Sequence, residues 1–138
     1  MTESNYVLAA WVVALTATLG ALFIGEVMGQ VPCVLCWYQR IAMFPIVAVL
    51  GLGLWLSDPG AWRYGMALAL IGVAVAAWHV LVYYGLVPQA IVPCTADGPS
   101  CSGEAMTLLG TVPLPLLSLG AFTLIAVLLL ASRRRITA

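Results

Sequence analysis

The chain has 138 residues, a formal net charge of zero, 64% hydrophobic residues and only 7% charged residues. It is too short for two ordinary domains, and it is too apolar for a soluble or a disordered chain. There is no basic surface to neutralise phosphates, so nucleic-acid binding is also excluded. The composition predicts a membrane protein of one domain.

Four stretches have no Asp, Glu, Lys or Arg and approach or exceed the roughly 20 apolar residues that cross a bilayer. They are residues 6–25, 41–57, 64–93 and 105–132, and the second continues backwards as a largely apolar segment to Val31. We therefore predict an all-α membrane protein, a single four-transmembrane-helix bundle over residues 1–138. The expected spans are 6–26, 33–56, 62–85 and 113–132, with extracytoplasmic loops at 27–32 and 86–112.

The orientation follows from the arginines, because Lys and Arg are retained on the cytoplasmic side of a membrane. Arg133, Arg134 and Arg135 follow the fourth span, and Arg63 follows the turn between the second and third spans. Four spans bring that turn and both termini to one side. Both termini are therefore expected to be cytoplasmic. The chain begins without Lys or Arg, so the first span is expected to be retained rather than cleaved as a signal peptide.

This topology sorts the four cysteines. Cys33 and Cys36 fall at the outer mouth of the second span, and Cys94 and Cys101 fall in the loop before the fourth. Inert packing cysteines would scatter through the spans, whereas these gather on the oxidising face of the membrane. Their clustering favours redox chemistry.

The first pair occurs in the run Pro32-Cys33-Val34-Leu35-Cys36. Proline is tolerated where a helix begins, and free N–H groups with the helix dipole stabilise a thiolate there. Arg40 is four residues after Cys36 and therefore shares its helix face, where a cation can stabilise the thiolate or an anionic ligand. The alternative for Arg40 is a side chain that snorkels to lipid head groups.

Other uses of a Cys-x-x-Cys pair fit less well. Haem attachment needs a histidine after the second cysteine, where this chain has Trp37, and two histidine ligands are excluded because His79 is the only histidine. A structural zinc site is disfavoured by the six residues between Cys94 and Cys101 and by the oxidising location. No metal ligands are therefore predicted, and thioredoxin's βαβ pattern is absent from the sequence.

The run Glu26-Val27-Met28-Gly29-Gln30-Val31-Pro32-Cys33-Val34-Leu35-Cys36-Trp37-Tyr38-Gln39-Arg40-Ile41-Ala42-Met43-Phe44-Pro45 closely resembles the DsbB family of membrane disulfide-forming oxidoreductases, in its BdbC-like branch. The resemblance covers the whole chain. It includes His79 near the outer end of the third span, the second cysteine pair, and the start of the fourth span at Pro113-Leu114-Pro115-Leu116.

The resemblance implies a protein-dithiol:quinone oxidoreductase of the bacterial inner membrane. It would reoxidise a thioredoxin-like, DsbA-like extracytoplasmic oxidase and pass two electrons to ubiquinone or menaquinone. By position, Cys94 would be attacked by the partner, Cys101 would exchange with Cys33, and Cys36 would meet the quinone ring beside Arg40.

Three further residues are candidates for quinone binding. His79 is expected there from its position and the resemblance, with helix capping or packing as the alternative. Gln39 is next to Arg40 in the sequence, but its side chain is expected to point from another face of the helix. Glu26 is expected either to pair with Arg40 or His79 or to end a helix in solvent. The interval from Cys94 to Cys101 is shorter than in the best-known members of the family, and its turn-forming residues favour a locally closed loop disulfide.

Two other classes of function stay open at this point. A vitamin K epoxide reductase-like enzyme also combines a helix bundle with paired cysteines, but its loop pair precedes its helix-mouth pair, opposite to the order here. A non-enzymatic four-span protein with disulfide-stapled loops would keep all four cysteines oxidised. That reading leaves Arg40 without a role.

Overall fold

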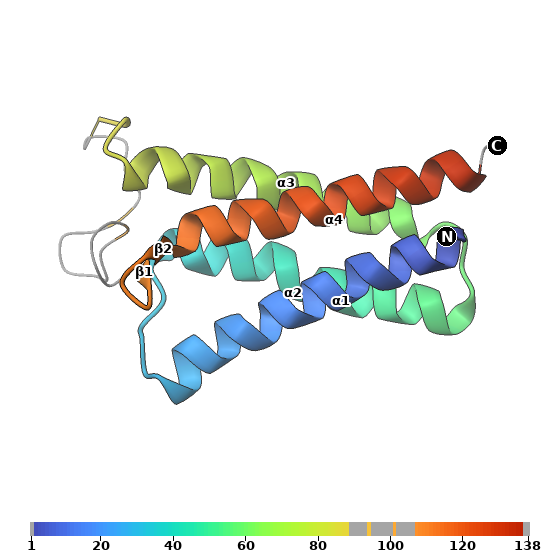
Figure 1. Ribbon diagram of the computed structural model, residues 1–138, viewed down its shortest axis with the longest axis horizontal. Coiled ribbons are helices and arrows are strands. Elements are labelled where there is room, and N and C mark those ends of the chain that lie inside the picture. The colour runs from blue at the N-terminus through green and yellow to red at the C-terminus, as the bar shows by residue number, and fades with distance from the viewer. Residues whose placement is uncertain (1, 89–93, 95–100, 102–106, 137–138) are drawn as a thin grey trace.

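The computed structural model describes residues 2–88, 94, 101 and 107–136, and the following description is confined to them. Four long helices run alternately up and down (Figure 1). They are α1 (Glu3–Leu22), continued by the π-helix η1 (Phe23–Val27), then α2 (Val34–Leu56), α3 (Ala61–Tyr83) and α4 (Leu114–Ile136). All four are long and apolar enough to cross a membrane, which confirms the predicted fold class.

The helix bounds differ from the expected spans by a few residues. The first helix begins at Glu3 rather than residue 6, and the fourth continues to Ile136 rather than 132. The second begins after Cys33, which caps it. Where the bilayer itself begins and ends along each helix stays a prediction.

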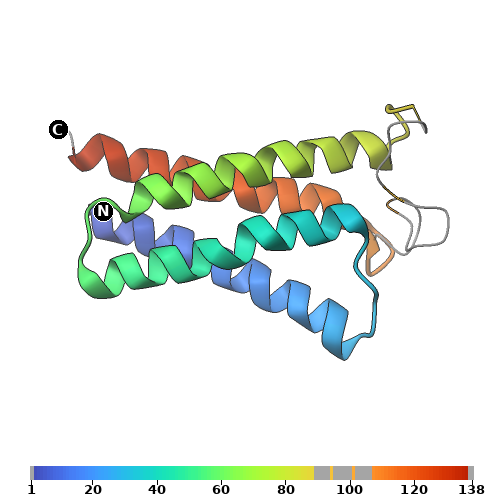
Figure 2. The same cartoon turned by 180° about the vertical axis from the view of Figure 1, so that it is seen from behind.

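Both chain termini lie at one end of the bundle, together with the turn between α2 and α3 (Figures 1 and 2). In that turn, Ser57 adopts a left-handed conformation with φ of 52° and the Gly60 N–H donates to the Asp58 carboxylate at 2.8 Å. We call this the terminal end. The opposite end, which holds the start of α2 and the end of α3, is called the cysteine end.

Each helix packs mainly on its two neighbours, so that α1, α2, α3 and α4 close a ring of four. The ring is loosest at the cysteine end, where α1 and η1 lean away from the other helices in both views (Figures 1 and 2). An irregular segment, residues 28–33, then returns the chain to the start of α2. This divergence leaves room beside the first cysteine pair.

The core combines large side chains on α2 and α4 with small ones on α1 and α3. Ile46, Leu50, Phe122, Ile125 and Leu129 are fully buried, and they pack with the alanines Ala10, Ala14, Ala69 and Ala76. Small residues let helices approach closely inside a membrane, where packing rather than hydrophobicity drives association. Many large apolar side chains are left on the outside, as expected of a surface that faces lipid.

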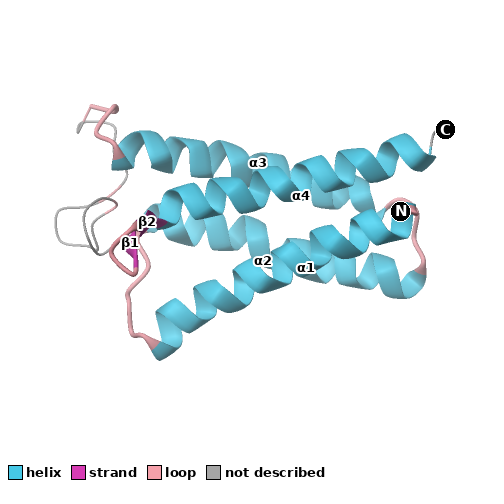
Figure 3. Ribbon diagram, viewed as in Figure 1, coloured by secondary structure: helices cyan, strands magenta, loops and turns pink. Residues whose placement is uncertain are grey.

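One addition to the predicted all-helical fold precedes α4. Strands β1 (Thr107–Leu108) and β2 (Val112–Pro113) form an antiparallel pair directly before that helix (Figure 3). Leu109 and Gly110 both have positive φ, 55° and 72°, which makes the tight turn between the strands. This hairpin fixes how the loop enters α4.

The contact between Gly72 and Phe122 yields a stability prediction. A Cβ added at Gly72 would overlap the Phe122 ring, whereas one added at Gly20 meets nothing within 4 Å. Gly72→Ala should therefore lower the free energy of unfolding by about 1–3 kcal/mol through overpacking. Gly20→Ala is the matched control and should be neutral or stabilising, because alanine favours helix more than glycine does. Denaturant unfolding of both variants in one detergent measures the difference, and equal effects would contradict this account of the core.

Candidate functional site

The first cysteine pair is built into the start of α2. Cys33 is the residue that caps the helix, with extended backbone (φ −70°, ψ 170°), and its sulfur accepts a hydrogen bond from the Cys36 N–H at 3.2 Å. The two sulfur atoms lie 2.7 Å apart. A disulfide requires about 2.05 Å, so a shift of under 1 Å would join them. The predicted placement of this pair at a helix N-terminus is confirmed.

The surroundings favour the thiolate form of Cys33. A hydrogen bond with the Cys36 side chain is the main cause that lowers the pKa of the Cys33 thiol below its ordinary range. Burial opposes this shift in pKa, while hydrogen bonds with His79 and with the Cys36 backbone reinforce it. Since backbone N–H groups can only donate, the sulfur of Cys33 is the acceptor, which is the arrangement that stabilises a thiolate.

The second pair is joined by a disulfide between Cys94 and Cys101, with Cα atoms 6.1 Å apart. This is the locally closed loop disulfide that the short interval favoured. Cys94 is half-buried, whereas Cys101 is buried. The intervening residues 95–100, on which the turn was predicted, lie outside the described part of the chain.

The two cysteine pairs meet at His79. The sulfur atoms of Cys33 and Cys101 and a ring nitrogen of His79 all lie within 4.8 Å of one another, and all three residues are buried. Such a set of atoms can bind a metal ion in principle. Here, however, Cys101 is bonded to Cys94, and the His79 Nε2 atom lies 3.2 Å from the Cys101 carbonyl oxygen. The cluster is better suited to sulfur exchange.

Gln39 completes this buried group. Its Nε2 atom lies 2.9 Å from Nδ1 of His79, and both side chains are buried. His79 and Gln39, which the sequence predicted separately as candidates for quinone binding, are thus in contact with each other. With one ring nitrogen near Gln39 and the other near Cys101, the hydrogen-bonding capacity of His79 is used within the protein.

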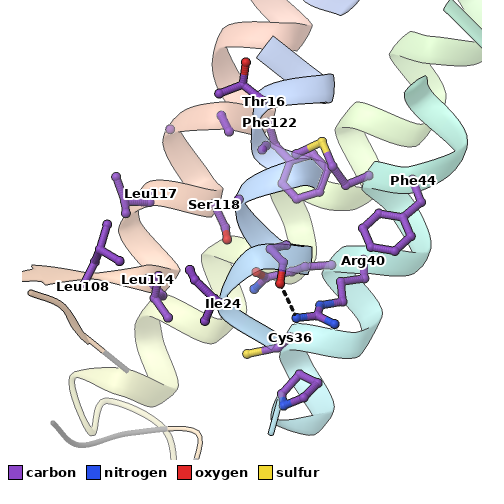
Figure 4. A pocket seen from close by; sticks show the side chains of 18 of the residues that line it. Thr16, Ile24, Cys36, Arg40, Phe44, Leu108, Leu114, Leu117, Ser118 and Phe122 are labelled. Carbon is purple, nitrogen blue, oxygen red and sulfur yellow. Dashed lines mark hydrogen bonds between the residues drawn. The ribbon is translucent and has the colours of Figure 1, made fainter. Parts of the chain in front are cut away.

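Arg40 lies one turn below Cys36 on α2 and reaches towards α1. It donates from Nη2 to the carbonyl oxygen of Ala21 at 2.8 Å (Figure 4), and its guanidinium lies 5.5 Å from the centroid of the Trp37 ring. A Cβ added at Gly25 would come within 2.9 Å of Nη2. The small residue and the wide π-helical turn around it thus make room for the cation, a common use of π-helical turns at functional sites.

A cavity of about 1000 Å³ lies beside Cys36 and Arg40. Figure 4 shows apolar side chains around it, including Ile24 of η1, Phe44 of α2 and Phe122 of α4. Its polar lining residues are few, and they are Thr16, Gln30, Cys36, Gln39, Arg40, His79 and Ser118. An apolar cavity with a few convergent polar groups is typical of a small-molecule site.

The expected pairing of Glu26 is wrong. Glu26 is exposed and does not line the cavity, and Arg40 bonds a backbone carbonyl instead of a carboxylate. Of the two readings of Glu26, the solvent-exposed helix end is the one that fits. Sequence reasoning did not single out Ala21 and Gly25 for this site, although two small residues four positions apart in the first span are typical of a face that packs closely on another helix.

The fold and these contacts define a class of protein: a four-helix membrane protein with two adjoining cysteine pairs, arranged as in a thiol-disulfide oxidoreductase. The family model described as "Disulfide bond formation protein DsbB" matches residues 3–132. The chain therefore belongs to the DsbB family, and it is a disulfide-bond-forming oxidoreductase of the membrane.

Named relatives agree with this assignment. The chain is 59% identical over 133 residues to a "Probable disulfide formation protein" of Metapseudomonas resinovorans, covering 96% of this chain and 92% of the relative. It is 38% identical over 122 residues to "Disulfide bond formation protein C" of Bacillus subtilis, covering 88% of each. A "Probable disulfide formation protein" of Deinococcus radiodurans is 37% identical over 145 residues, with 99% and 94% coverage. No solved structure matches the chain. Neither the vitamin K epoxide reductase-like reading nor the non-enzymatic reading is favoured.

The hydrogen bond between the helix cysteines yields a prediction about Cys33. In a Cys94→Ser, Cys101→Ser background, reduced Cys36→Ala should have a Cys33 thiol of higher pKa, because the side-chain donor is lost. At a given mildly acidic pH the thiolate fraction should fall, as measured by ultraviolet absorbance of the thiolate. Cys36→Ser keeps a donor and serves as the matched control. Identical titrations of the alanine and serine variants would refute this origin of the shift.

Proposed function

We propose that this chain oxidises a thioredoxin-like dithiol protein outside the cytoplasm and passes the two electrons to a membrane quinone. The observation that carries this proposal is the continuity of the site: the loop disulfide approaches Cys33, Cys33 approaches Cys36, and Cys36 opens onto a large apolar cavity. Electrons that enter at the loop can therefore leave at the cavity through sulfur exchange alone.

The partner enters at Cys94. Of the two loop cysteines it is the less buried, so an incoming thiolate reaches its sulfur more easily. Attack forms a mixed disulfide with Cys94, breaks the Cys94–Cys101 bond and leaves the electron pair on Cys101. The second thiol of the partner then displaces Cys94, and the partner departs as a disulfide.

The second exchange connects the two pairs. The Cys101 thiolate attacks the sulfur of Cys33 in a Cys33–Cys36 disulfide, and Cys36 leaves as a thiolate. Cys94 then attacks Cys101, which restores the loop disulfide and releases Cys33. The net result is a reduced helix pair and an oxidised loop, with both electrons now beside the cavity. The short approach of Cys33 to both Cys36 and Cys101 supports this order.

The cavity fits a quinone, because its walls are largely apolar and Cys36 and Arg40 both line it. When bound, a quinone supplies an acceptor for two electrons and two protons. Cys36 presents a sulfur to the ring, and Arg40 presents a cation one turn away that stabilises negative charge. The generic aliphatic lining suits either ubiquinone or menaquinone. Glu26, which is exposed, has no part in this proposal.

The same geometry supports insertion in the bacterial inner membrane with the cysteine end outside. Arg63 and Arg133 both lie against the Trp62 ring, 5.8 and 5.7 Å from its centroid, at the terminal end. Arginines favour the cytoplasmic side. The cysteine loops then face the oxidising compartment, where a thioredoxin-like partner would be met.

Quinone reduction tests the proposal. Purified protein in detergent is mixed with a reduced thioredoxin-like dithiol protein and either ubiquinone or menaquinone, and quinone absorbance is followed. Cys36→Ser should abolish the reaction, and Arg40→Ala should lower kcat/KM for quinone by at least about tenfold through lost charge stabilisation. Arg63→Ala is the matched control and should be unaffected, because Arg63 lies at the other end of the bundle. Unchanged reduction by Cys36→Ser would refute the scheme.

The order of exchange has its own test. A variant with Cys36→Ser and Cys94→Ser retains Cys33 and Cys101, whose sulfurs lie within 4.8 Å. Mild oxidation should join them in high yield, as detected by mass spectrometry of proteolytic fragments. The comparison is the variant with Cys33→Ser and Cys101→Ser, which retains Cys36 and Cys94 and should cross-link less. Equal yields would show that the route does not depend on Cys33 and Cys101.

A further inference from the structure

His79 joins three segments that are far apart in the sequence. The side chain comes from α3 and is 1% exposed, Gln39 comes from α2 and is 7% exposed, and Cys101 comes from the loop before α4. Burying a polar group without a hydrogen-bond partner costs free energy. The hydrogen bonds among His79, Gln39 and Cys101 therefore determine how these residues are placed.

The direction of each hydrogen bond follows from the chemistry of the atoms. A backbone carbonyl can only accept, so the His79 Nε2 atom, 3.2 Å from the Cys101 oxygen, must carry a proton and donate. In a neutral imidazole Nδ1 is then an acceptor. Gln39 meets that requirement by placing its amide nitrogen, a donor, 2.9 Å from Nδ1. The contacts of both ring nitrogens therefore require the same tautomer, with the proton on Nε2 and none on Nδ1.

The two hydrogen bonds, from Gln39 to His79 and from His79 to Cys101, end at the backbone carbonyl of Cys101 and not at its sulfur. The disulfide to Cys94 is the bond that the incoming partner breaks. The contact between His79 and the Cys101 carbonyl involves neither sulfur of that disulfide, so it is retained after the disulfide opens. It therefore acts during the interval in which the freed Cys101 thiolate must find Cys33.

We propose that Gln39 is a positioning residue which fixes the Nε2–H tautomer of His79, so that His79 holds the Cys101 backbone and keeps its sulfur beside Cys33. The inference rests on the proposed sulfur exchange between the two cysteine pairs. It explains how the Cys101 sulfur is kept close enough to Cys33 for that exchange. Holding two reacting groups together raises their effective concentration. The effect of Gln39 thus reaches the sulfurs through His79.

The tautomer can be observed directly, because His79 is the only histidine in the chain. Protein labelled with ¹⁵N-histidine and purified on a histidine-free tag should show a protonated Nε2 and an unprotonated Nδ1. In Gln39→Leu the donor to Nδ1 is lost, and the signals should move towards a mixture of tautomers. A wild-type ring protonated on Nδ1 alone would overturn the proposal, whatever the variants do.

The consequence for Cys101 is measured without quinone or partner. In the Cys36→Ser, Cys94→Ser background, titration of the Cys33–Cys101 disulfide against glutathione gives the effective concentration of the two thiols. Gln39→Leu should lower it by about tenfold or more, the size expected for loss of a buried hydrogen bond. Gln39→Glu should restore it, because a carboxylate stabilises a doubly protonated ring that still donates from Nε2.

Ser132→Ala is the control, since it removes a buried hydrogen bond to the Leu129 carbonyl in the terminal half of α4. It should leave the effective concentration unchanged. A value within twofold of wild type in Gln39→Leu would overturn the proposal, as would an equal loss in the glutamate and leucine variants. If Gln39→Leu fails to fold, the proposal is tested by the tautomer of the wild-type ring and by the effective concentration of the two thiols in Gln39→Glu. Failure of quinone reduction alone would count against the proposed function and would leave these equilibrium measurements intact.

Discussion

The site depends on Cys33 being the residue that caps α2. A cap must accept a hydrogen bond from the first turn of its helix, and here a sulfur atom performs that role for the Cys36 N–H. This one contact fixes the spacing of the Cys33–Cys36 pair and orients Cys36 down the helix towards the cavity. It also leaves Cys33 facing His79 and the loop, 3.9 Å from the ring nitrogen. Local helix chemistry thus places Cys33 and Cys36 for both steps of the proposed sulfur exchange.

The second requirement is space, and it comes from the divergence of α1. A closed four-helix ring would fill the region beside Cys36 with side chains, as it does around Leu50 and Leu129. At the cysteine end the π-helical turn η1 and Gly25 widen the gap instead, and Arg40 reaches across it to the Ala21 carbonyl. The packed half of the bundle can remain rigid while the cavity opens at the other end.

Much of this arrangement could be predicted from the sequence, because it follows from local rules. Gaps between charges predicted four helices, and Pro32 before the cysteines predicted a helix start. The interval between Cys94 and Cys101 favoured a disulfide within the loop. Contacts between helices could not be predicted in this way. The Ala21 carbonyl, the partner of Arg40, belongs to the backbone and so leaves no signal in the sequence, whereas the charge of Glu26 is visible there and makes that residue one candidate partner. The hairpin before α4 was also missed, since its turn uses Leu109 in a conformation that leucine rarely adopts.

The resting contact of Arg40 bears on when its charge acts. At rest the guanidinium donates to a neutral carbonyl, and a hydrogen bond to an anion is roughly twice as strong as one to a neutral acceptor. Arg40 therefore gains little from an uncharged ring in the cavity and more once negative charge develops there. Under the proposed function, this difference favours the state formed by electron transfer over the state that precedes it, which is the condition for accelerating a reaction rather than merely binding its reactant.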